Sequence, residues 1–468
     1  MSAPVRAVIA PARAAAFGAL LAIARGRTDM DRALDQARRQ VQDPRDAALL
    51  REIVTGTLRW QARVDWVLTP LLRVPWARMD AEVQTALRMG AFQLLFLDRL
   101  PASAVVHDAV ALVKQARRSS AAGLVNAVLR RVAAGDRRPL PDVPVEAPLA
   151  DIAAALATVA SHPAWLVERW LGRVSREEVD AWLAFNNTPG PPTLRVNPLA
   201  GVTVDAVRAA LEAEGVATSA CTHAPWGLVV TSGAVTGSAV VADGRALLQD
   251  EGSQLTGLVA PVAPGDRVLD VCAAPGGKTL GYAFRAGASG RVVACDVRRG
   301  RLETLAATVS RGRAATVRVV GIDPDAPLPF RVAFDVVAVD APCSGLGALR
   351  RDPDIKWRRT ADGLAAFASR QLELLRRAAE TVAPGGALVY TTCSTEPEEN
   401  GDVVSRFLAE SPAFGREAAG GAGVQERLAP FVTAQGEFLT RPGRDRLEGY
   451  YGAVLRRARG RSRGAVVQ

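Results

Sequence analysis

The sequence is poor in lysine. Of its 58 basic residues only three, Lys114, Lys278 and Lys356, are lysines, and the other 55 are arginines. A bias this strong reflects genome composition, so a lysine that remains is a candidate for a position that requires lysine. Two of the three lie within the motifs described below.

Cysteine and histidine are also scarce. The five cysteines are odd in number and form no CxxC pair, which argues against a disulfide framework and against a zinc ribbon. The three histidines are scattered along the chain, so we expect no metal site. Free cysteines without a disulfide pattern are typical of a reducing compartment, and we therefore expect a cytoplasmic protein.

Long hydrophobic runs are missing as well. No apolar run reaches the roughly 18 residues of a membrane-spanning helix, so we expect no membrane partner. The segment "ARAAAFGALLAIARG" (12–26) has the length of a signal-peptide core. Its residues Phe17, Leu20 and Leu21 follow helical spacing and arginines flank both ends, so we favour a first amphipathic helix over a signal peptide.

Positive charge outweighs negative charge. The formal net charge is +10, which makes nucleic acid the first candidate partner. A length of 468 residues is enough for two or three domains with cores of their own. We expect a monomer.

Successive segments differ in their patterns. Residues 1–140 carry apolar residues at spacings of three and four, which predicts an all-α domain, and the proline-rich residues 137–151 predict a linker. Residues 152–250 mix helical patterns with short strands and predict a small α/β unit. Residues 251–458 predict a larger α/β domain, and residues 459–468 a basic disordered tail.

The larger domain contains short apolar runs rich in β-branched residues: "RVLDV", "RVVACD", "TVRVV", "FDVVAVD" and "ALVYTT". Strands buried on both faces have this pattern, and helical segments separate them. We therefore predict a Rossmann-like parallel sheet with helices on either side. Near the end, "EFLTRP" and "YYGAVLRR" predict a closing antiparallel pair.

A glycine turn follows the first of these strands, in "VLDVCAAPGGKT" (268–279). Its small residues let the backbone approach a ligand closely, and the following helix offers free N–H groups. Nicotinamide enzymes have such a turn too, but their G-x-G-x-x-G fingerprint is absent here. The candidate cofactor-binding residues of the turn are Cys272, Ala273, Ala274, Pro275, Gly276, Gly277 and Lys278.

Acidic residues follow the next three strands. Asp296 is placed to accept the hydroxyls of a ribose, Asp323 to reach an adenine amino group, and Asp340 follows the fourth strand. Each alone is more often a helix cap than a ligand. Together with the glycine turn, the three carboxylates favour a nucleoside-bearing cofactor.

Two cysteines lie at the same predicted edge. Cys343 and Cys393 each follow a strand and precede a serine, whereas Cys272 and Cys295 fit buried structural positions. Beside a nucleoside cofactor, a thiolate suits methylation of cytosine. Its addition to carbon 6 makes carbon 5 nucleophilic toward a methyl group, and loss of the carbon 5 proton expels the thiol. Asp340 is placed as the acid beside ring nitrogen 3, and the base has to leave its stack.

The quoted motifs carry a family resemblance. "DVCAAPGGKT", "DAPCSGLGALRRDPDIKW", "YTTCSTEPEEN" and the preceding "LLQDEGSQL" resemble the motifs of the RNA cytosine-5 methyltransferases. In the first domain, "FQLLFLDRLPASAVVHDAV" and "GLVNAVLRR" resemble the antitermination factor NusB. That fusion is characteristic of the RsmB (Sun) group, which methylates 16S ribosomal RNA. The resemblance covers about residues 10–456 and implies a methyltransferase that uses S-adenosylmethionine.

The resemblance implies catalytic roles. Cys393 would be the nucleophile, and Cys343 would assist release of the methylated RNA. DNA cytosine methyltransferases attack with their Pro-Cys cysteine, which keeps Cys343 as the rival nucleophile. Lys278 would contact the target base or the RNA backbone.

It also implies binding roles. Residues 272–278 would hold S-adenosylmethionine, with Asp296 on its ribose, Asp323 near adenine, and Asp340 near the methionine end and the target base. Three further residues are candidate RNA contacts: Lys356, Arg130 and Arg131. For the two arginines, a solvated helix end is an equally good interpretation.

Other functions stay open at this stage. Transfer RNA is an alternative substrate, and a non-catalytic NusB-like partner of RNA or transcription is an alternative class. A nicotinamide oxidoreductase is a third, although it lacks the fingerprint.

Overall fold

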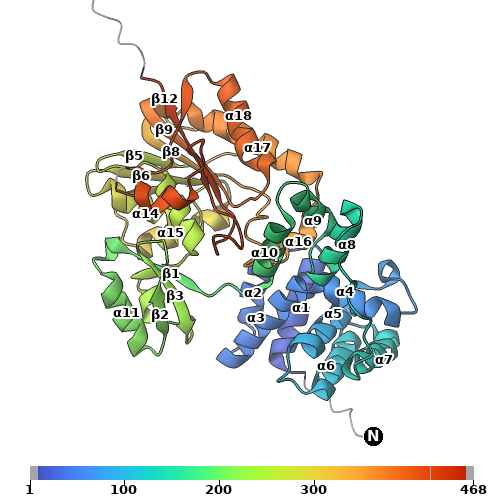
Figure 1. Ribbon diagram of the computed structural model, residues 1–468. Coiled ribbons are helices and arrows are strands. Elements are labelled where there is room, and N and C mark those ends of the chain that lie inside the picture. The colour runs from blue at the N-terminus through green and yellow to red at the C-terminus, as the bar shows by residue number, and fades with distance from the viewer. Residues whose placement is uncertain (1–8, 422, 460–468) are drawn as a thin grey trace, which may run out of the picture. The chain divides into compact units, whose positions relative to one another are not determined.

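The computed structural model describes residues 9–421 and 423–459. Within them the chain forms two compact units (Figure 1). The helical unit comprises the residues up to Thr188 together with Leu349–Ala361, and the sheet unit comprises Pro189–Ala348 and the residues from Asp362 onward. Of the predicted basic tail, all but Arg459 lies outside the described residues.

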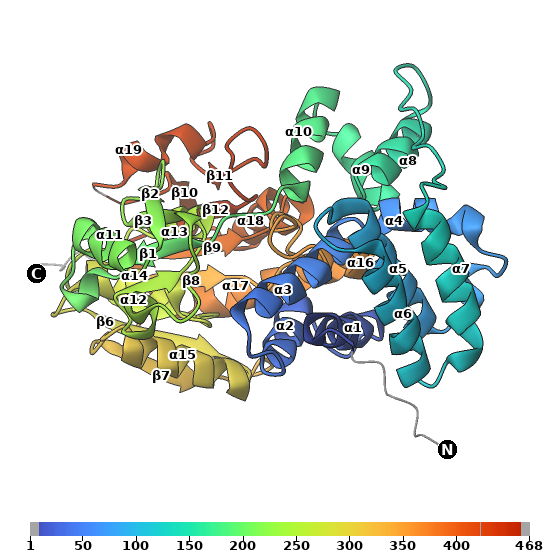
Figure 2. The ribbon, with the colours of Figure 1, turned by 90° about the horizontal axis from the view of Figure 1, so that it is seen from below.

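The helical unit confirms the all-α prediction for the first domain. Figure 2 shows α5, α6 and α7 packed beside one another. Asp29 and Asp43 cap α2 and α3 by accepting main-chain N–H groups, and Pro44 occupies the first position of α3. The helices of this unit are α1 (Pro11–Ala24), α2 (Met30–Arg38), α3 (Pro44–Arg59), α4 (Gln61–Leu68), α5 (Ala81–Phe96), α6 (Ala102–Gln115), α7 (Ala122–Ala133), α8 (Leu149–Val159), α9 (Ala164–Leu171), α10 (Arg176–Asn187) and α16 (Ile355–Arg358).

A short segment returns to the helical unit from far along the sequence. Asp354 accepts the main-chain N–H of Met30 at 3.2 Å, and the indole N–H of Trp357 donates to the carbonyl of Leu58 at 2.6 Å. Residues 349–361 therefore fold with the helices, although their sequence predicts a place in the α/β domain.

The sheet unit begins with a small antiparallel sheet of order β2-β3-β1-β4. Leu194 and Leu228 of this sheet pack with Leu211 of helix α11 in one apolar core. The elements are β1 (Thr193–Val196), α11 (Val204–Ala213), β2 (Ala217–Ala220), β3 (Gly227–Ser232), α12 (Ala239–Ala242) and β4 (Ala246–Leu248).

The large sheet has the order β10-β12-β9-β8-β5-β6-β7, and β11 also pairs with β12. Strands β5 to β9 pair in parallel, whereas β10, β11 and β12 pair antiparallel. Both the parallel sheet and its antiparallel closure are thus confirmed. The strands are β5 (Arg267–Asp270), β6 (Arg291–Asp296), β7 (Val317–Gly321), β8 (Phe334–Asp340), β9 (Val382–Thr392), β10 (Phe414–Glu417), β11 (Phe438–Leu439) and β12 (Tyr451–Arg457).

Helices cover both faces of the large sheet. Helices α13, α14 and α15 contribute to one apolar core with residues such as Leu255, Leu280 and Leu305, and α17 and α18 contribute to another with Leu372 and Phe407. Two cores explain why the central strands are apolar on both sides. The helices are α13 (Glu251–Val259), α14 (Gly277–Ala286), α15 (Arg299–Arg311), α17 (Gly363–Ala379), α18 (Gly401–Glu410) and α19 (Gln425–Leu428).

The parallel pairing brings several polar residues to one edge. Strands β5, β6 and β8 end at Asp270, Asp296 and Asp340, and β9 ends at Thr392, directly before Cys393. These strands are neighbours in the order β9-β8-β5-β6, so their carboxyl ends form one rim. Ligands of doubly wound sheets bind at this rim.

Among residues 9–421 and 423–459, no helix is both long and apolar enough to cross a membrane. In the same ranges, no group of three or more His, Cys, Asp or Glu side chains is arranged to hold a metal ion.

Candidate functional site

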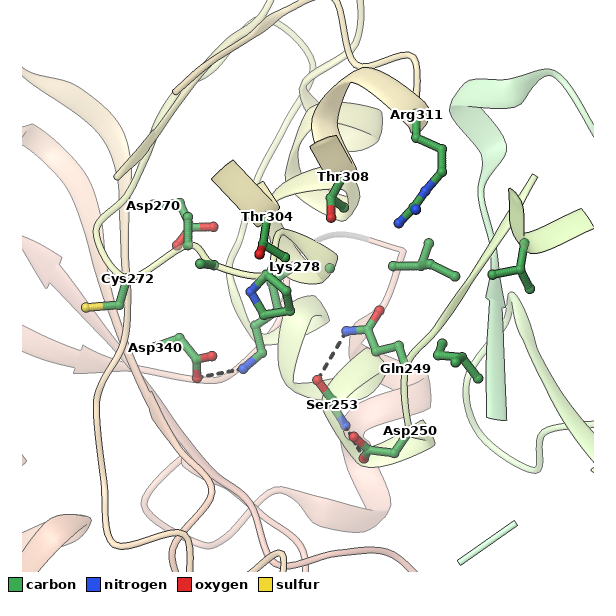
Figure 3. Close-up of a pocket in the computed structure, with 17 residues that line it drawn as sticks. Gln249, Asp250, Ser253, Asp270, Cys272, Lys278, Thr304, Thr308, Arg311 and Asp340 are labelled. Carbon is green, nitrogen blue, oxygen red and sulfur yellow. Dashed lines mark hydrogen bonds and ion pairs between the residues drawn. The ribbon is translucent and has the colours of Figure 1, made fainter. Parts of the chain in front are cut away.

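A cavity of about 420 Å³ opens at this rim (Figure 3). Its walls come from the turn between β5 and α14, the end of β8, helix α15, and the segment from α12 to α13. Within the sheet unit it is lined by Val241, Leu247, Leu248, Gln249, Asp250, Ser253, Asp270, Cys272, Ala273, Ala274, Pro275, Gly277, Lys278, Thr304, Thr308, Arg311 and Asp340.

Most of the predicted glycine-turn residues line this cavity, and Gly276 does not. Gly276 instead has a φ of 109°, a region that favours glycine. A Cβ atom there would lie 3.0 Å from Leu305 and 3.1 Å from Thr308, because α15 packs against the back of the turn. The glycine thus lets the backbone line the cavity, which fits a closely approaching ligand.

An ion pair joins two predicted residues at the cavity wall. Lys278 Nζ lies 2.6 Å from Asp340 Oδ1, and the hydroxyl of Thr391 donates to the same oxygen at 2.9 Å. Burial by itself lowers the pKa of Lys278, but the charge and hydrogen bond of Asp340 outweigh it, so the pKa of Lys278 is raised. The lysine therefore stays charged inside the site.

Asp270 is a cavity residue that the sequence reasoning missed. Its carboxylate is buried and accepts a hydrogen bond from the Thr279 hydroxyl at 2.7 Å. Burial raises the pKa of Asp270 to about 7, and the hydrogen bond from Thr279 opposes that rise. The sequence contains the same signal for Asp270 as for Asp296 and Asp340, because each of these carboxylates ends a strand.

The segment before α13 also supplies residues without a predicted role. Asp250 caps α13 by accepting the main-chain N–H of Ser253 at 2.9 Å, and the amide of Gln249 donates to the Ser253 hydroxyl at 3.1 Å (Figure 3). Arg311 lines the cavity from the end of α15. The stretch "LLQDEGSQL" was a family motif in the sequence, but only the tertiary structure brings it to the cavity.

Asp296 and Asp323 lie outside the cavity lining. Asp296 is buried, and its Oδ2 lies 3.2 Å from Nε of Arg301, which also donates to the carbonyl of Ala274 at 2.7 Å. Asp323 is exposed and accepts the main-chain N–H of Asp325 at 2.8 Å. The two carboxylates sit at successive strand ends, but Asp296 already has a cationic partner.

The two candidate catalytic cysteines meet. Their Sγ atoms are 3.1 Å apart, and the main-chain N–H of Cys393 points to Cys343 Sγ at 3.4 Å. The hydrogen bond with Cys393, together with burial, raises the pKa of Cys343 well above its usual value. Cys393 is also close enough to Lys278 for its charge to raise the pKa of that lysine. Neither thiol is among the residues that line the cavity; both follow the ends of β8 and β9, where Asp340 and Thr391 lie.

Two of the remaining cysteines, Cys272 and Cys295, have raised pKa values. Burial raises the pKa of Cys272 far above the ordinary thiol value and that of Cys295 to about 12. A thiol that stays protonated is a poor nucleophile.

Lys356 is not placed as a surface contact for RNA, which corrects the expectation from the sequence. Its side chain is 1 % exposed, and Nζ donates to Ser161 O at 3.1 Å and to Asn187 Oδ1 at 2.9 Å. Burial, with the nearby charge of Arg59, lowers the pKa of Lys356 well below its usual value. An amine held by carbonyl oxygens in the interior serves the packing of the helical unit.

Arg130 and Arg131 lie on the last turn of α7 and are exposed. Arg131 forms an ion pair with Asp136 at 2.7 Å, and both side chains remain about half exposed. Their position is open to a partner, and the structure leaves their role in RNA binding as a prediction.

Comparisons with known proteins agree with this architecture. Residues 258–456 match the family 16S rRNA methyltransferase RsmB/F, residues 162–236 match the ferredoxin-like domain of RsmF/B-like methyltransferases, and residues 10–134 match the NusB family. The crystal structure of PH0851 superposes with a TM-score of 0.80 at 25% identity, over 96% of this chain and 99% of that chain.

Named relatives extend over most of the chain. Ribosomal RNA small subunit methyltransferase B of Pseudomonas putida is 36% identical over 86% of this chain and 89% of its own length. The probable ribosomal RNA small subunit methyltransferase B of Bacillus subtilis is 31% identical over 82% and 85%. The chain therefore belongs to the RsmB/F family of RNA methyltransferases, with a NusB-family domain at its N-terminal end.

Proposed function

We propose that this protein transfers a methyl group from S-adenosylmethionine to carbon 5 of a cytosine in 16S ribosomal RNA. The observation that carries the proposal is the pair of sulfur atoms 3.1 Å apart, on the loops that follow β8 and β9, with the Lys278–Asp340 ion pair at the end of β8. A methyl transfer to an oxygen or nitrogen needs no thiol. A transfer to carbon 5 of cytosine does need a nucleophile that activates the ring.

The residues of the cavity fit S-adenosylmethionine. When bound, it would supply an electrophilic methyl group. The backbone of residues 272–277 and the N-terminus of α14 would hold it, and Asp296 would accept its ribose hydroxyls once Arg301 gives way. Asp323 would lie on the adenine side as an exposed acceptor. The positive φ of Gly276 and its close packing against Leu305 support a backbone cradle at this turn.

The chain's own side chains account for the chemistry of the base. Cys393 Sγ loses its proton to solvent and adds to carbon 6 of an extruded cytosine, while Asp340 passes a proton from the charged Lys278 to ring nitrogen 3. After carbon 5 is methylated, its proton is lost to solvent, nitrogen 3 returns its proton to the Lys278–Asp340 pair, and the bond between sulfur and carbon 6 breaks. Lys278 holds Asp340 in place and compensates negative charge. Cys343 stays a thiol because its pKa is raised, and it lies within hydrogen-bond distance of Cys393. It is therefore placed to protonate the Cys393 sulfur as that sulfur leaves the methylated base.

The helical unit would position the RNA. NusB-family similarity and the exposed arginines at the end of α7 support this role. Deletion of the first 140 residues would test this role. It would, however, also remove Leu58 and Met30, the hydrogen-bond partners of Trp357 and Asp354. The charge reversal Arg130→Glu with Arg131→Glu is therefore the cleaner test, and it should weaken RNA binding while leaving cofactor binding unchanged.

A labelled methyl donor tests the proposed function. The protein is incubated with it and with unmodified 16S ribosomal RNA or transfer RNA, and bisulfite sequencing then identifies 5-methylcytosine. The proposal expects label at carbon 5 of cytosine in the 16S RNA. Label on transfer RNA alone would show that transfer RNA is the substrate instead. Label at an atom other than carbon 5 would refute the proposed attack of a cysteine on the base.

A further inference from the structure

One buried carboxylate connects the loops that carry the two cysteines. Glu399 Oε1 accepts the main-chain N–H of Ser344 at 2.7 Å and the amide of Gln371 at 3.0 Å. Its Oε2 accepts the hydroxyl of Ser394 at 2.6 Å. The side chain is completely buried, so these hydrogen bonds are made without competition from water.

The two serines are the residues that directly follow the cysteines. Ser344 follows Cys343 and Ser394 follows Cys393, and their hydroxyl oxygens are 3.2 Å apart. The loops are also tied at the main chain, because Gly347 N–H donates to the carbonyl of Cys393 at 2.9 Å. Glu399 therefore lies at the centre of a cross-link between the two loops.

The buried side chain of Glu399 is held by hydrogen bonds. Among the described residues, no lysine, arginine or histidine forms an ion pair with Glu399, so its desolvation is offset by hydrogen bonds alone. Its main chain already serves the local fold, since the Tyr390 hydroxyl donates to the Glu399 carbonyl at 2.6 Å. The side chain points the other way, to Ser344 and Ser394.

We infer that Glu399 is a positioning residue for the two thiols. It holds Ser344 and Ser394 together, and through them it fixes the distance and direction between Cys343 Sγ and Cys393 Sγ. This role rests on the proposed function, in which one thiol attacks the base and the other assists its release. Glu399 itself touches neither RNA nor cofactor in this assignment.

The first readout measures the geometry without any catalysis. Diamide oxidises two neighbouring thiols to a disulfide, taking two electrons and two protons to become a hydrazine. In the wild-type chain the sulfurs are already in contact, so the Cys343–Cys393 disulfide should form rapidly and be countable by mass spectrometry of peptides. Glu399→Ala removes three acceptor contacts, and the rate of disulfide formation should fall by about tenfold or more, as expected when reacting atoms lose their alignment.

The second readout is methyl transfer. Glu399→Ala should lower kcat by about 100-fold, the order expected for a misplacement of about 1 Å, and leave the KM for RNA unchanged. Glu399→Gln is the conservative variant. Its amide oxygen can still accept from Ser344, and its N–H groups can donate to the Ser394 hydroxyl, so both rates should return to within about threefold of wild type.

Tyr390→Phe is the matched control. It removes a buried hydrogen bond of the same residue but leaves the carboxylate contacts intact. It should lower the melting temperature and leave the diamide rate unchanged. If Glu399→Ala does not fold, Ser394→Ala removes one arm of the cross-link and should slow both readouts in the same direction.

The outcomes separate the two hypotheses. Wild-type diamide and methylation rates in folded Glu399→Ala would overturn the inference. So would equal losses in Glu399→Ala and Tyr390→Phe at equal loss of stability. Failure of the proposed function would appear differently, as a wild-type chain that methylates no RNA while its diamide rate still depends on Glu399.

Discussion

The Sγ atom of Cys393 lies 3.1 Å from the Sγ atom of Cys343, and the main-chain N–H of Cys393 points to Cys343 Sγ. Only one of two touching thiols can ionise easily, because a second negative charge at this distance is repelled. The hydrogen bond with Cys393 and burial together raise the pKa of Cys343. The assignment of Cys393 as the attacking residue is a prediction that the variants below test.

Replacing Cys393 and replacing Cys343 should have different effects on methyl transfer and on adduct formation. Cys393→Ala should abolish methyl transfer and adduct formation, because no nucleophile remains for carbon 6. Cys343→Ala should still attack the base but release it slowly, so a covalent protein–RNA complex should accumulate. Denaturing gel electrophoresis with labelled RNA measures both. An adduct in Cys393→Ala together with none in Cys343→Ala would exchange the two roles.

Asp270 should make stability depend on pH. Its pKa is raised to about 7, compared with about 3.9 in the unfolded chain. Between these values the folded state binds a proton that the unfolded state does not, so the free energy of unfolding falls as pH rises from about 4 to about 7, by up to about 1.4 kcal/mol per pH unit.

The variant Asp270→Asn checks this dependence. It stays neutral, so its stability relative to wild type should be greater at pH 8 than at pH 5. Thermal unfolding at both pH values measures the difference. A difference between variant and wild type that is the same at both pH values would show that Asp270 is ionised throughout.

Lys278 and Asp340 should act as one unit. Lys278→Met and Asp340→Ala should each slow formation of the covalent RNA adduct, since the first removes the compensating charge and the second removes the acid. Because the side chains are 2.6 Å apart, the double variant should lose less than the sum of the two, with a coupling of about 0.5–3 kcal/mol. Strictly additive losses in the double-mutant cycle would contradict a shared role.

Asp296 should govern affinity for S-adenosylmethionine. Asp296→Ala removes a charged acceptor for two ribose hydroxyls, and the dissociation constant should rise by about 10- to 100-fold, the equivalent of about 1.5–3 kcal/mol. Calorimetric titration of the donor measures the change. Asp323→Ala is the control, because that side chain is exposed and should have the smaller effect. Equal effects of both variants would contradict the assignment of the ribose to Asp296.

Lys356 should contribute to the stability of the protein and not to its affinity for RNA. Lys356→Met leaves the carbonyl of Ser161 and the side-chain oxygen of Asn187 without their buried donor, which should cost about 1–3 kcal/mol. RNA affinity at fixed salt should remain unchanged, since the side chain is 1 % exposed. A reduced salt dependence of RNA binding in a fully stable variant would instead support a contact between Lys356 and RNA.

Much of the fold could be predicted from local pattern. Apolar runs of β-branched residues predict the parallel strands, because strands covered on both faces cannot alternate. The glycine turn and the carboxylates at strand ends follow from the same order, and so does the approach of Cys343 to Cys393 at one rim. The motif resemblance added the family, which the comparisons confirm.

The remainder depended on contacts that no local pattern contains. Lys356 and Trp357 fold with helices some 300 positions earlier in the chain, because a side chain follows its packing partners and not its sequence neighbours. Glu399 carries no signal beyond an acidic loop, and its role depends on two serines brought together from different strands. Strand order and motif spacing fix which chemical groups reach the rim of the sheet. Tertiary packing alone decided which of them are buried, paired or free to react, since burial and distance set the cost of a charge.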